Sequence, residues 1–250
     1  QYQRYPDNVR ARELVLRNMA EKPDYLQSSN LLSQFLQDSF WGIRQEALGF
    51  FDEDSLKLFA EHEEQIMTMA RNDMHPLVRA EALAILAVSE DAQKYRDIFI
   101  SGLADSSYSA VGYALYGLLE TKPENAESIV SDFIGYNNFN ITSSLADYFI
   151  SNTVPDRIGW FEDKLYKYSG SELWYFTRFY AIYLMMQPED VVASGISVLE
   201  KIARSHYQFY IRVAAYQSLQ LLIDHDGVQD ILDDIKKRET DERVKVYYTE

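Results

Sequence analysis

A histidine followed by a glutamate is the pattern in this sequence that most resembles the metal-binding motif of a hydrolase. His62-Glu63 is the only such pair, and a zinc-peptidase helix needs a second histidine at the fifth position of the motif, so that both imidazoles share one face. That position is Ile66. The motif is therefore incomplete, and we expect His62 and Glu63 to lie on the polar face of a long helix that begins near Asp54.

The remaining candidate ligands are better explained by helix ends. Asp224-His225-Asp226 has residue types that bind metals, but capping acids in a turn between two helices account for it more simply. His75-Pro76 fits the start of a helix. Because the chain has no cysteine, thiolate metal sites, disulfides and cysteine nucleophiles are excluded. We predict no catalytic residue, no metal ligand and no cofactor-binding residue in this chain.

Other reaction and binding classes are disfavoured by missing motifs and by charge. No glycine-rich phosphate loop, Gly-x-Ser-x-Gly elbow or Ser-x-x-Lys pattern is present. The 39 acidic residues exceed the 24 basic ones, which gives a net charge of −15. The excess is spread along the chain, as expected of a solvated surface, and it argues against nucleic-acid binding, including that of a repeat-built DNA glycosylase.

The apolar segments of the chain are short. The longest run, Ala82–Val88, is far below the ~20 residues of a bilayer span, so no membrane span is expected. The chain begins at Gln1 without a methionine, and we expect a processed or excised piece of a longer protein. The cellular location is therefore left open.

Two aromatic clusters are the remaining candidates for binding. Six aromatic residues crowd one predicted helix and four more crowd the equivalent helix one repeat later: Trp174, Tyr175, Phe176, Phe179, Tyr180 and Tyr183, then Tyr207, Phe209, Tyr210 and Tyr216. They could be core residues with tyrosine hydroxyls at the rim, or they could line a groove for a peptide or protein partner. Both interpretations stay open at this point.

Internal repeats reveal the elements that must position these residues. The segment Ile43-Arg44-Gln45-Glu46-Ala47-Leu48 returns as Val78-Arg79-Ala80-Glu81-Ala82-Leu83 and then in weaker form. Its small-residue position recurs at 47, 82, 114, 181, 215 and 246, with one diverged unit centred on Ala146. The mean period of about 33 residues is typical of helical solenoids. A small residue there would allow the neighbouring helix to approach closely.

A second marker has the same period. Proline followed by an acid occurs four times, and acid clusters occupy the missing positions: Pro23-Asp24, Pro123-Glu124, Pro155-Asp156 and Pro188-Glu189, with Asp52–Asp54, Glu90-Asp91 and Asp224–Asp226. Proline and acids both suit the first turn of a helix. Each repeat is therefore predicted to begin its first helix near this marker and to carry the Arg-x-x-Ala segment on its second helix.

An aspartate precedes the second helix in three repeats, at Asp38, Asp73 and Asp105. It can cap that helix, and the arginine of a neighbouring repeat, such as Arg44 or Arg79, can pair with it and form a ladder. This spacing resembles HEAT repeats, whereas the tetratricopeptide and ankyrin motifs are absent. We predict an all-α chain: one α-α superhelix, a HEAT/armadillo-like solenoid of about seven to eight helix pairs, over residues 1–250 as a single domain.

One family resemblance is carried by the N-terminal third. Tyr2, the Arg10-x-Arg12-Glu13-Leu14 segment and Asp38–Leu48 resemble the far C-terminal region of bacterial M1-family zinc aminopeptidases, with aromatic-Trp-Gly-Ile-Arg as the most specific part. The resemblance implies a helical companion domain that roofs the active-site cavity and limits peptide access. The family's zinc motif and its Gly-x-Met-x-Asn loop are absent here, so zinc is implied only for an upstream catalytic domain that this chain lacks.

Two functions follow as expectations. In the first, the chain is a non-catalytic C-terminal domain of an M1-like metallopeptidase, and its partners are its own catalytic domain and peptide substrates. In the second, it is a free-standing HEAT-repeat scaffold that binds a protein partner. An enzyme built on helical repeats is a third class, disfavoured because the predicted array is open and no carboxylate pair stands out. This chain alone is not expected to be an enzyme, although the parent protein would be a zinc aminopeptidase.

Overall fold

The computed structural model describes residues 8–20, 31–51 and 56–248. Over these residues it contains 15 α-helices and two short 3-10 helices, and no β-strand. The prediction of an all-α chain is confirmed. The chain divides into two compact units, residues 1–144 and 145–250, so the prediction of one continuous domain over 1–250 stays a prediction, as does the superhelical arrangement of the pairs.

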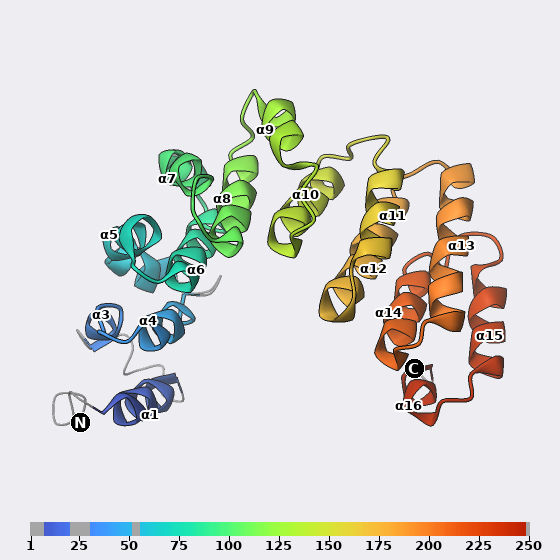
Figure 1. Ribbon diagram of the computed structural model, residues 1–250, viewed down its shortest axis with the longest axis horizontal. Coiled ribbons are helices and arrows are strands. Elements are labelled where there is room, and N and C mark those ends of the chain that lie inside the picture. Colours follow the sequence, from blue (N-terminus) through green and yellow to red (C-terminus); the bar gives the residue numbers. More distant parts are fainter. Residues whose placement is uncertain (1–7, 21–30, 52–55, 249–250) are drawn as a thin grey trace. The chain divides into compact units, whose positions relative to one another are not determined.

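The first unit holds nine helical elements and the beginning of a tenth (Figure 1). They are α1 (Val9–Ala20), α3 (Leu31–Phe35), α4 (Trp41–Leu48), α5 (Leu56–Asn72), α6 (Pro76–Ala87), η2 (Ala92–Tyr95), α7 (Arg96–Gly102), α8 (Tyr108–Glu120), α9 (Ala126–Phe133) and the first part of α10 (Phe139–Ser151).

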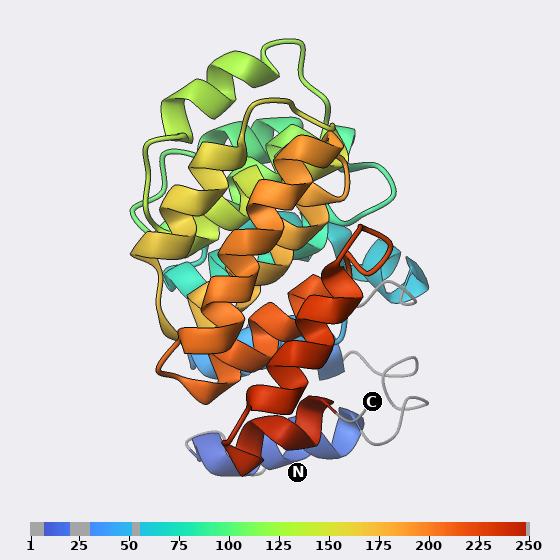
Figure 2. The same cartoon turned by 90° about the vertical axis from the view of Figure 1, so that its right-hand side faces the viewer.

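The second unit continues from α10 with α11 (Ile158–Lys167), α12 (Gly170–Leu184), α13 (Glu189–Ser205), α14 (Phe209–Gln220), α15 (Val228–Arg238), α16 (Glu242–Lys245) and η3 (Val246–Tyr248). Helix α14 packs against α12, α13, α15 and α16. Helices α13 and α15, drawn in orange and red, lie side by side (Figure 2).

Consecutive helices pack in pairs within each unit. In the first unit α3 contacts α4, α5 contacts α6, and α7 contacts α8. Helix α6 also packs between α4 and α8, so these three form one row, and α5 contacts α7 on the other side (Figure 1). In the second unit the pairs are α11 with α12 and α13 with α14. The predicted two-helix unit is therefore present.

The small residue of each repeat lies at the packed face of a second helix. Six alanines at these positions are fully buried: Ala47, Ala82, Ala114, Ala146, Ala181 and Ala215. The burial of Ala146 in α10 also confirms the position assigned to the diverged repeat. The final repeat is different, because Val246 is 68% exposed and Val244 is buried instead. The prediction was wrong there, since the short α16 gives way to a 3-10 turn at Val246.

The proline-acid markers lie at the starts of first helices as predicted, although their prolines stand outside the first turn. Helices α9 and α11 follow the markers at 123–124 and 155–156, and α13 begins at Glu189 of the third marker, so that acid lies in the first turn. Pro188 is the N-cap of α13 rather than a first-turn residue. The proline that does occupy a first turn is Pro76, on the second helix α6. The markers at 23–24 and 52–54, and Tyr2 of the family resemblance, lie outside the described residues.

Candidate functional site

Three aspartates form the same turn before α4, α6 and α8. Oδ1 of Asp38, Asp73 and Asp105 each accepts a hydrogen bond of 2.8 Å from the backbone N–H two residues later. Each aspartate thus provides an acceptor for a backbone N–H just ahead of the helix. The predicted capping of the helix was wrong, because the bonded N–H belongs to the N-cap residue (Phe40, His75 or Ser107) and not to the helix itself.

Each of these carboxylates also pairs with an arginine of the preceding repeat. Arg12 reaches Asp38 at 2.8 and 3.0 Å, Arg44 reaches Asp73 at 2.7 Å through two nitrogens, and Arg79 reaches Asp105 at 2.6 and 2.8 Å. Two parallel N–H···O bonds make these pairs both strong and geometrically specific. The predicted arginine–aspartate ladder is therefore present in the first unit.

The ladder arginines serve their own repeat as well. Nη1 of Arg44 donates to the carbonyl of Asp38, and Nη1 of Arg79 to that of Asp73, both at 2.7 Å. One guanidinium thus joins two consecutive turns. The pairing holds the pKa of Asp105 below its usual value and raises that of Arg79, chiefly through the Arg79–Asp105 hydrogen bonds. These charged groups have structural partners, which makes them unsuitable as acid–base catalysts.

The second unit repeats this geometry with residues that the sequence reasoning missed. Arg212 donates to the carbonyl of His206 at 2.9 Å and pairs with Glu239 at 3.0 Å. Nδ1 of His206 accepts from the N–H of Gln208 at 3.2 Å, as the aspartates do. In the first unit, Asn138 likewise accepts at 3.1 Å from the N–H two residues later, at the start of α10. The sequence signal that could have found the turn in the second unit is the six-residue spacing from His206 to Arg212. The residue type at the first position was no guide, because histidine stands where the turns before α4, α6 and α8 have aspartate.

The histidines occupy structural positions. His62 lies on α5 as predicted, with Nδ1 at 3.0 Å from the carbonyl of Leu58, and the incomplete motif's fifth position, Ile66, is fully buried. His225 lies in the turn before α15 and pairs with Glu189 at 3.0 Å. In the described part of the chain, no three histidine or acidic side chains come together where they could hold a metal ion.

His75 begins α6 as predicted, but it also makes a contact that the sequence did not suggest. Its ring stacks on Trp41, with centroids 3.8 Å apart and planes inclined by 6°. Trp41 begins α4, so the stack joins the starts of two neighbouring second helices. The Trp that contributed to the family resemblance is accounted for here by packing between repeats.

The aromatic clusters combine core and partly exposed residues. Phe176, Tyr180 and Tyr183 are fully buried. Tyr180 donates its hydroxyl to Glu162 at 2.8 Å, and Tyr183 donates to the carbonyl of Val154 at 2.9 Å. These residues support the core-and-rim interpretation. Half-buried members are Trp174, Phe179, Phe209 and Tyr210, and the exposed ones are Tyr175 at 50% and Tyr207 at 80%.

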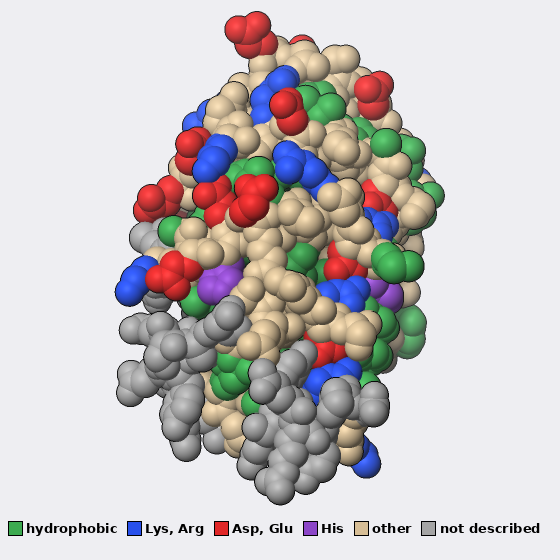
Figure 3. All heavy atoms as spheres, turned by 90° about the vertical axis from the view of Figure 1, so that its left-hand side faces the viewer, with side chains coloured by type: hydrophobic (Ala, Val, Ile, Leu, Met, Phe, Trp, Pro, Cys, Tyr) green, Lys and Arg blue, Asp and Glu red, His purple; other side chains and the backbone are tan. Residues whose placement is uncertain are grey.

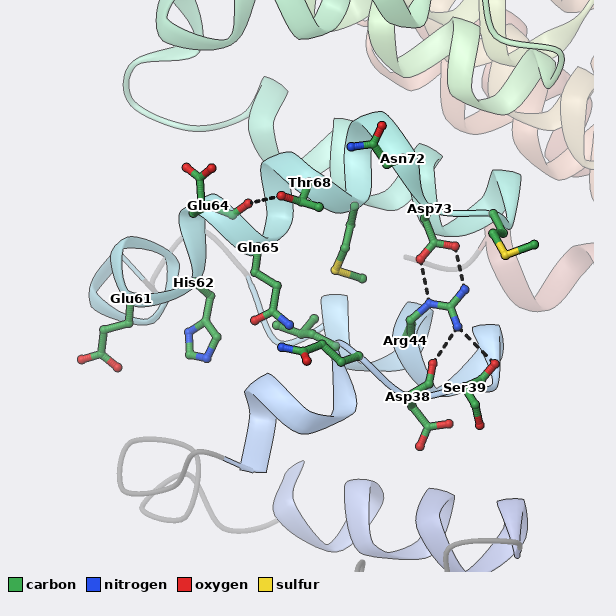
Figure 4. A pocket seen from close by; sticks show the side chains of 14 residues that line it. Asp38, Ser39, Arg44, Glu61, His62, Glu64, Gln65, Thr68, Asn72 and Asp73 are labelled. Atoms are coloured by element: carbon green, nitrogen blue, oxygen red, sulfur yellow. Dashed lines mark hydrogen bonds and ion pairs between the residues drawn. The ribbon is translucent and has the colours of Figure 1, made fainter.

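A hollow in the first unit lies beside α5 (Figure 4). It has a volume of about 790 Å³ and is bounded by the turn at 36–39 and by α5. Gln65 projects from α5 toward α3, where its Nε2 donates to the carbonyl of Ser33 at 3.1 Å. The ion pair of Arg44 with Asp73 closes the other end. Gln65, Arg44 and Asp73 thus use their polar groups to join successive repeats.

A second hollow, which we call the Tyr95 pocket, has a volume of about 510 Å³. It lies between α5, the end of α6 with the turn that follows, and η2, and is lined by Phe51, Phe59, Ala60, Glu63, Ile85, Val88, Ser89, Glu90, Asp91, Lys94 and Tyr95. Its walls are apolar: Phe51 and Ile85 are buried, and Phe59 meets Tyr95 edge-on with ring centroids 6.4 Å apart.

A carboxylate lies inside this pocket with two partners. The Tyr95 hydroxyl donates to Glu63 Oε1 at 2.5 Å, and the Lys94 ammonium bonds the same oxygen. These hydrogen bonds, the one from Lys94 first, hold the pKa of Glu63 below its ordinary value, and burial raises the pKa of Tyr95. Glu63 lies on the long helix α5 as predicted, and Lys94 and Tyr95 of η2 bond its carboxylate there. The carboxylate of Glu63 and the ring of Tyr95 both lie beside the Lys94 ammonium.

One face of the molecule shows how its surface charge is arranged. On the face presented in Figure 3, acidic side chains are interspersed with basic and apolar ones rather than gathered in one patch. Among the described helices, none combines the length and apolarity that a bilayer crossing requires.

No protein-family model, curated protein or solved structure matches this chain.

Proposed function

We propose that this chain is a non-catalytic helical-repeat module of the HEAT type, whose helix pairs stack into a solenoid and whose role is to bind a polypeptide. One observation carries this proposal: the same turn and arginine geometry recurs before α4, α6 and α14. A repeated joint of this kind orders successive helix pairs, and stacked pairs build the extended surfaces on which solenoid proteins bind their partners.

The use of the charged residues supports a binding role over catalysis. Asp38, Asp73 and Asp105 are all engaged by arginines and backbone N–H groups. A general acid or base needs a proton-accepting atom within reach of substrate and a pKa near the working pH. Permanently paired carboxylates meet neither need.

A narrower proposal places this module beside a zinc aminopeptidase catalytic domain, where it would roof the active-site cavity and limit peptide access. Its support is the resemblance of residues 38–48 to M1-family enzymes. This narrower proposal is tested separately by reading the coding sequence upstream of Gln1, which should encode His-Glu-x-x-His in the same reading frame. A complete gene without that motif would leave the free-standing scaffold as the function.

The general proposal is tested on the purified 250-residue chain. An immobilised array of nine-residue peptides, grouped as basic, acidic and uncharged, is probed with labelled protein, and hydrolysis of leucine p-nitroanilide is followed in parallel with and without added zinc. We expect selective retention on one peptide class and no hydrolysis. Hydrolysis that scales with protein and survives repurification would overturn the proposal, as would the absence of binding to every class.

A further inference from the structure

The Tyr95 pocket already contains a cation, supplied by the chain itself. The ammonium of Lys94 bonds Glu63 and lies 5.8 Å from the centroid of the Tyr95 ring. A carboxylate and an aromatic face together are the usual recognition elements for organic cations. Lys94 therefore shows which ligand chemistry this pocket accommodates.

Lys94 is not locked in place. Its side chain is 50% exposed, whereas that of Glu63 is 23% exposed. It belongs to the short 3-10 helix η2 at the rim of the pocket, so its ammonium can move into solvent while the carboxylate stays. An incoming cation can take its place without leaving Glu63 unpaired.

The mouth of the pocket carries additional negative charge. Glu90 and Asp91 are both exposed, and neither has an ion-pair partner within the described ranges. Glu63 is neutralised by Lys94, but these two carboxylates are not. Unpaired charge beside a low-dielectric hollow attracts ligands of opposite sign and raises their local concentration.

The walls of the pocket suit a long side chain with a charged end. Phe51, Phe59 and Ile85 offer apolar surface on which the methylene groups of arginine or lysine pack while the charged end reaches Glu63. A guanidinium has an advantage over the resident ammonium, because its planar fork bonds a carboxylate through two nitrogens and stacks on an aromatic ring.

From these observations we propose that the Tyr95 pocket binds an arginine side chain of a partner polypeptide, which displaces Lys94 from Glu63. The inference rests on the proposed function of the chain as a polypeptide-binding module and names the chemistry of its partner. The occupant is an arginine flanked by apolar residues, which would contact the exposed side chain of Val88 at the mouth.

The test uses the full 250-residue chain and two dye-labelled nine-residue peptides followed by fluorescence anisotropy. One has a central arginine between leucines, and the other has citrulline in its place, which keeps the shape and removes the charge. We expect the arginine peptide to bind at least about tenfold more tightly, as befits a hydrogen-bonded charge pair. A lysine peptide should fall between them.

Three variants connect this preference to the pocket. Glu63→Gln should abolish the discrimination between arginine and citrulline, and Lys94→Ala should tighten arginine binding, because the competing cation is gone. Glu64→Gln is the matched control: it removes one carboxylate from the same helix, yet Glu64 lines the groove on the other side of α5, so binding should not change. Far-UV circular dichroism checks that all variants remain helical.

The possible failures are distinct. Equal binding of the arginine and citrulline peptides by the unaltered chain would overturn the arginine pocket and leave the general binding function standing. Unchanged or weaker arginine binding by Lys94→Ala would also overturn it, even if Glu63→Gln failed to fold. Binding of none of the peptides here, together with an empty peptide array, would remove the proposed function itself.

Discussion

At the scale of single residues, the first unit depends on buried charge pairs that satisfy several groups at once. Asp38 shows this most clearly: its side chain is 1% exposed, and it holds both the Arg12 guanidinium and the N–H of Phe40. A buried ion pair is not by itself a large source of stability, but removal of one member leaves the other without compensation. The ladder is therefore a set of positions at which single substitutions are costly.

The first prediction concerns this pair. Asp38→Ala should lower the free energy of unfolding by about 3–5 kcal/mol, because Arg12 would remain buried and unpaired. The control is Arg17→Ala, which breaks the exposed pair between α1 and Glu46 of α4 and should cost less than about 1 kcal/mol. Urea unfolding followed by circular dichroism measures both variants. Equal losses in the free energy of unfolding would show that the buried ladder pair stabilises the fold no more than the exposed pair does.

The second prediction concerns pH. Arg79 holds the pKa of Asp105 below its ordinary value of 3.8. A carboxylate with a depressed folded-state pKa adds stability that is complete above the unfolded pKa and is lost as the pH falls toward the folded one. Asp105→Asn should therefore destabilise the protein near neutral pH, and the difference from the unaltered chain should shrink below about pH 4. Unfolding free energies measured from pH 7 to pH 3 give the comparison, and a constant difference would contradict the assignment.

At the scale of helices, the size of the side chains at and next to the small-residue positions determines how closely neighbouring helices approach. Gly112 of α8 faces α10 so closely that an added Cβ would lie 2.5 Å from the backbone oxygen of Asn140. Ser144 Oγ donates to the carbonyl of Gly112 at 2.9 Å across the same contact. The two helices are thus held by backbone proximity where the ladder arginine is replaced by Val111.

The third prediction follows from this contact. Gly112→Ala should destabilise the protein by about 1–3 kcal/mol, because backbone atoms must move to admit the methyl group. Gly159→Ala in α11 is the matched control, since nothing lies within 4 Å of its added Cβ. It should stabilise the protein by about 0.5–1 kcal/mol through the lower flexibility of the unfolded chain. Thermal unfolding of both variants would refute the close-approach argument if their midpoints moved in the same direction.

At the scale of the whole molecule, the same turn-and-arginine contact recurs between helix pairs. Each compact unit has its own packed helix pairs, and both use an arginine that bonds the carbonyl of its own turn. We propose a solenoid because this contact has the same geometry wherever it recurs.

The fourth prediction tests that proposal in solution. A compact domain of this length has a radius of gyration of about 18 Å, and a solenoid of stacked pairs should exceed it clearly. Small-angle X-ray scattering, extrapolated to zero concentration in moderate salt to suppress repulsion between these acidic chains, gives the value. A result near the compact limit would mean that the helix pairs fold back on one another.

The local pattern of residue types was enough to determine the helical class, the two-helix period, the buried alanines and the pairing of Arg44 and Arg79 with the next aspartates. These features depend on spacing of about 33 residues and on neighbours along the chain, which periodicity reports directly. The sequence also indicated that Phe176 and Tyr180 belong to a helix, although it left their burial undecided.

Only the tertiary structure decided the rest. It placed His206 and Asn138 in the role of aspartate, because a turn needs an acceptor atom and not one residue type. It brought Glu63 of α5 beneath Lys94 and Tyr95 of η2, and it stacked His75 on Trp41. Such contacts join residues about one repeat apart whose side chains follow no common motif. Their positions depend on how helices rotate and pack, and packing is a property of the folded chain as a whole.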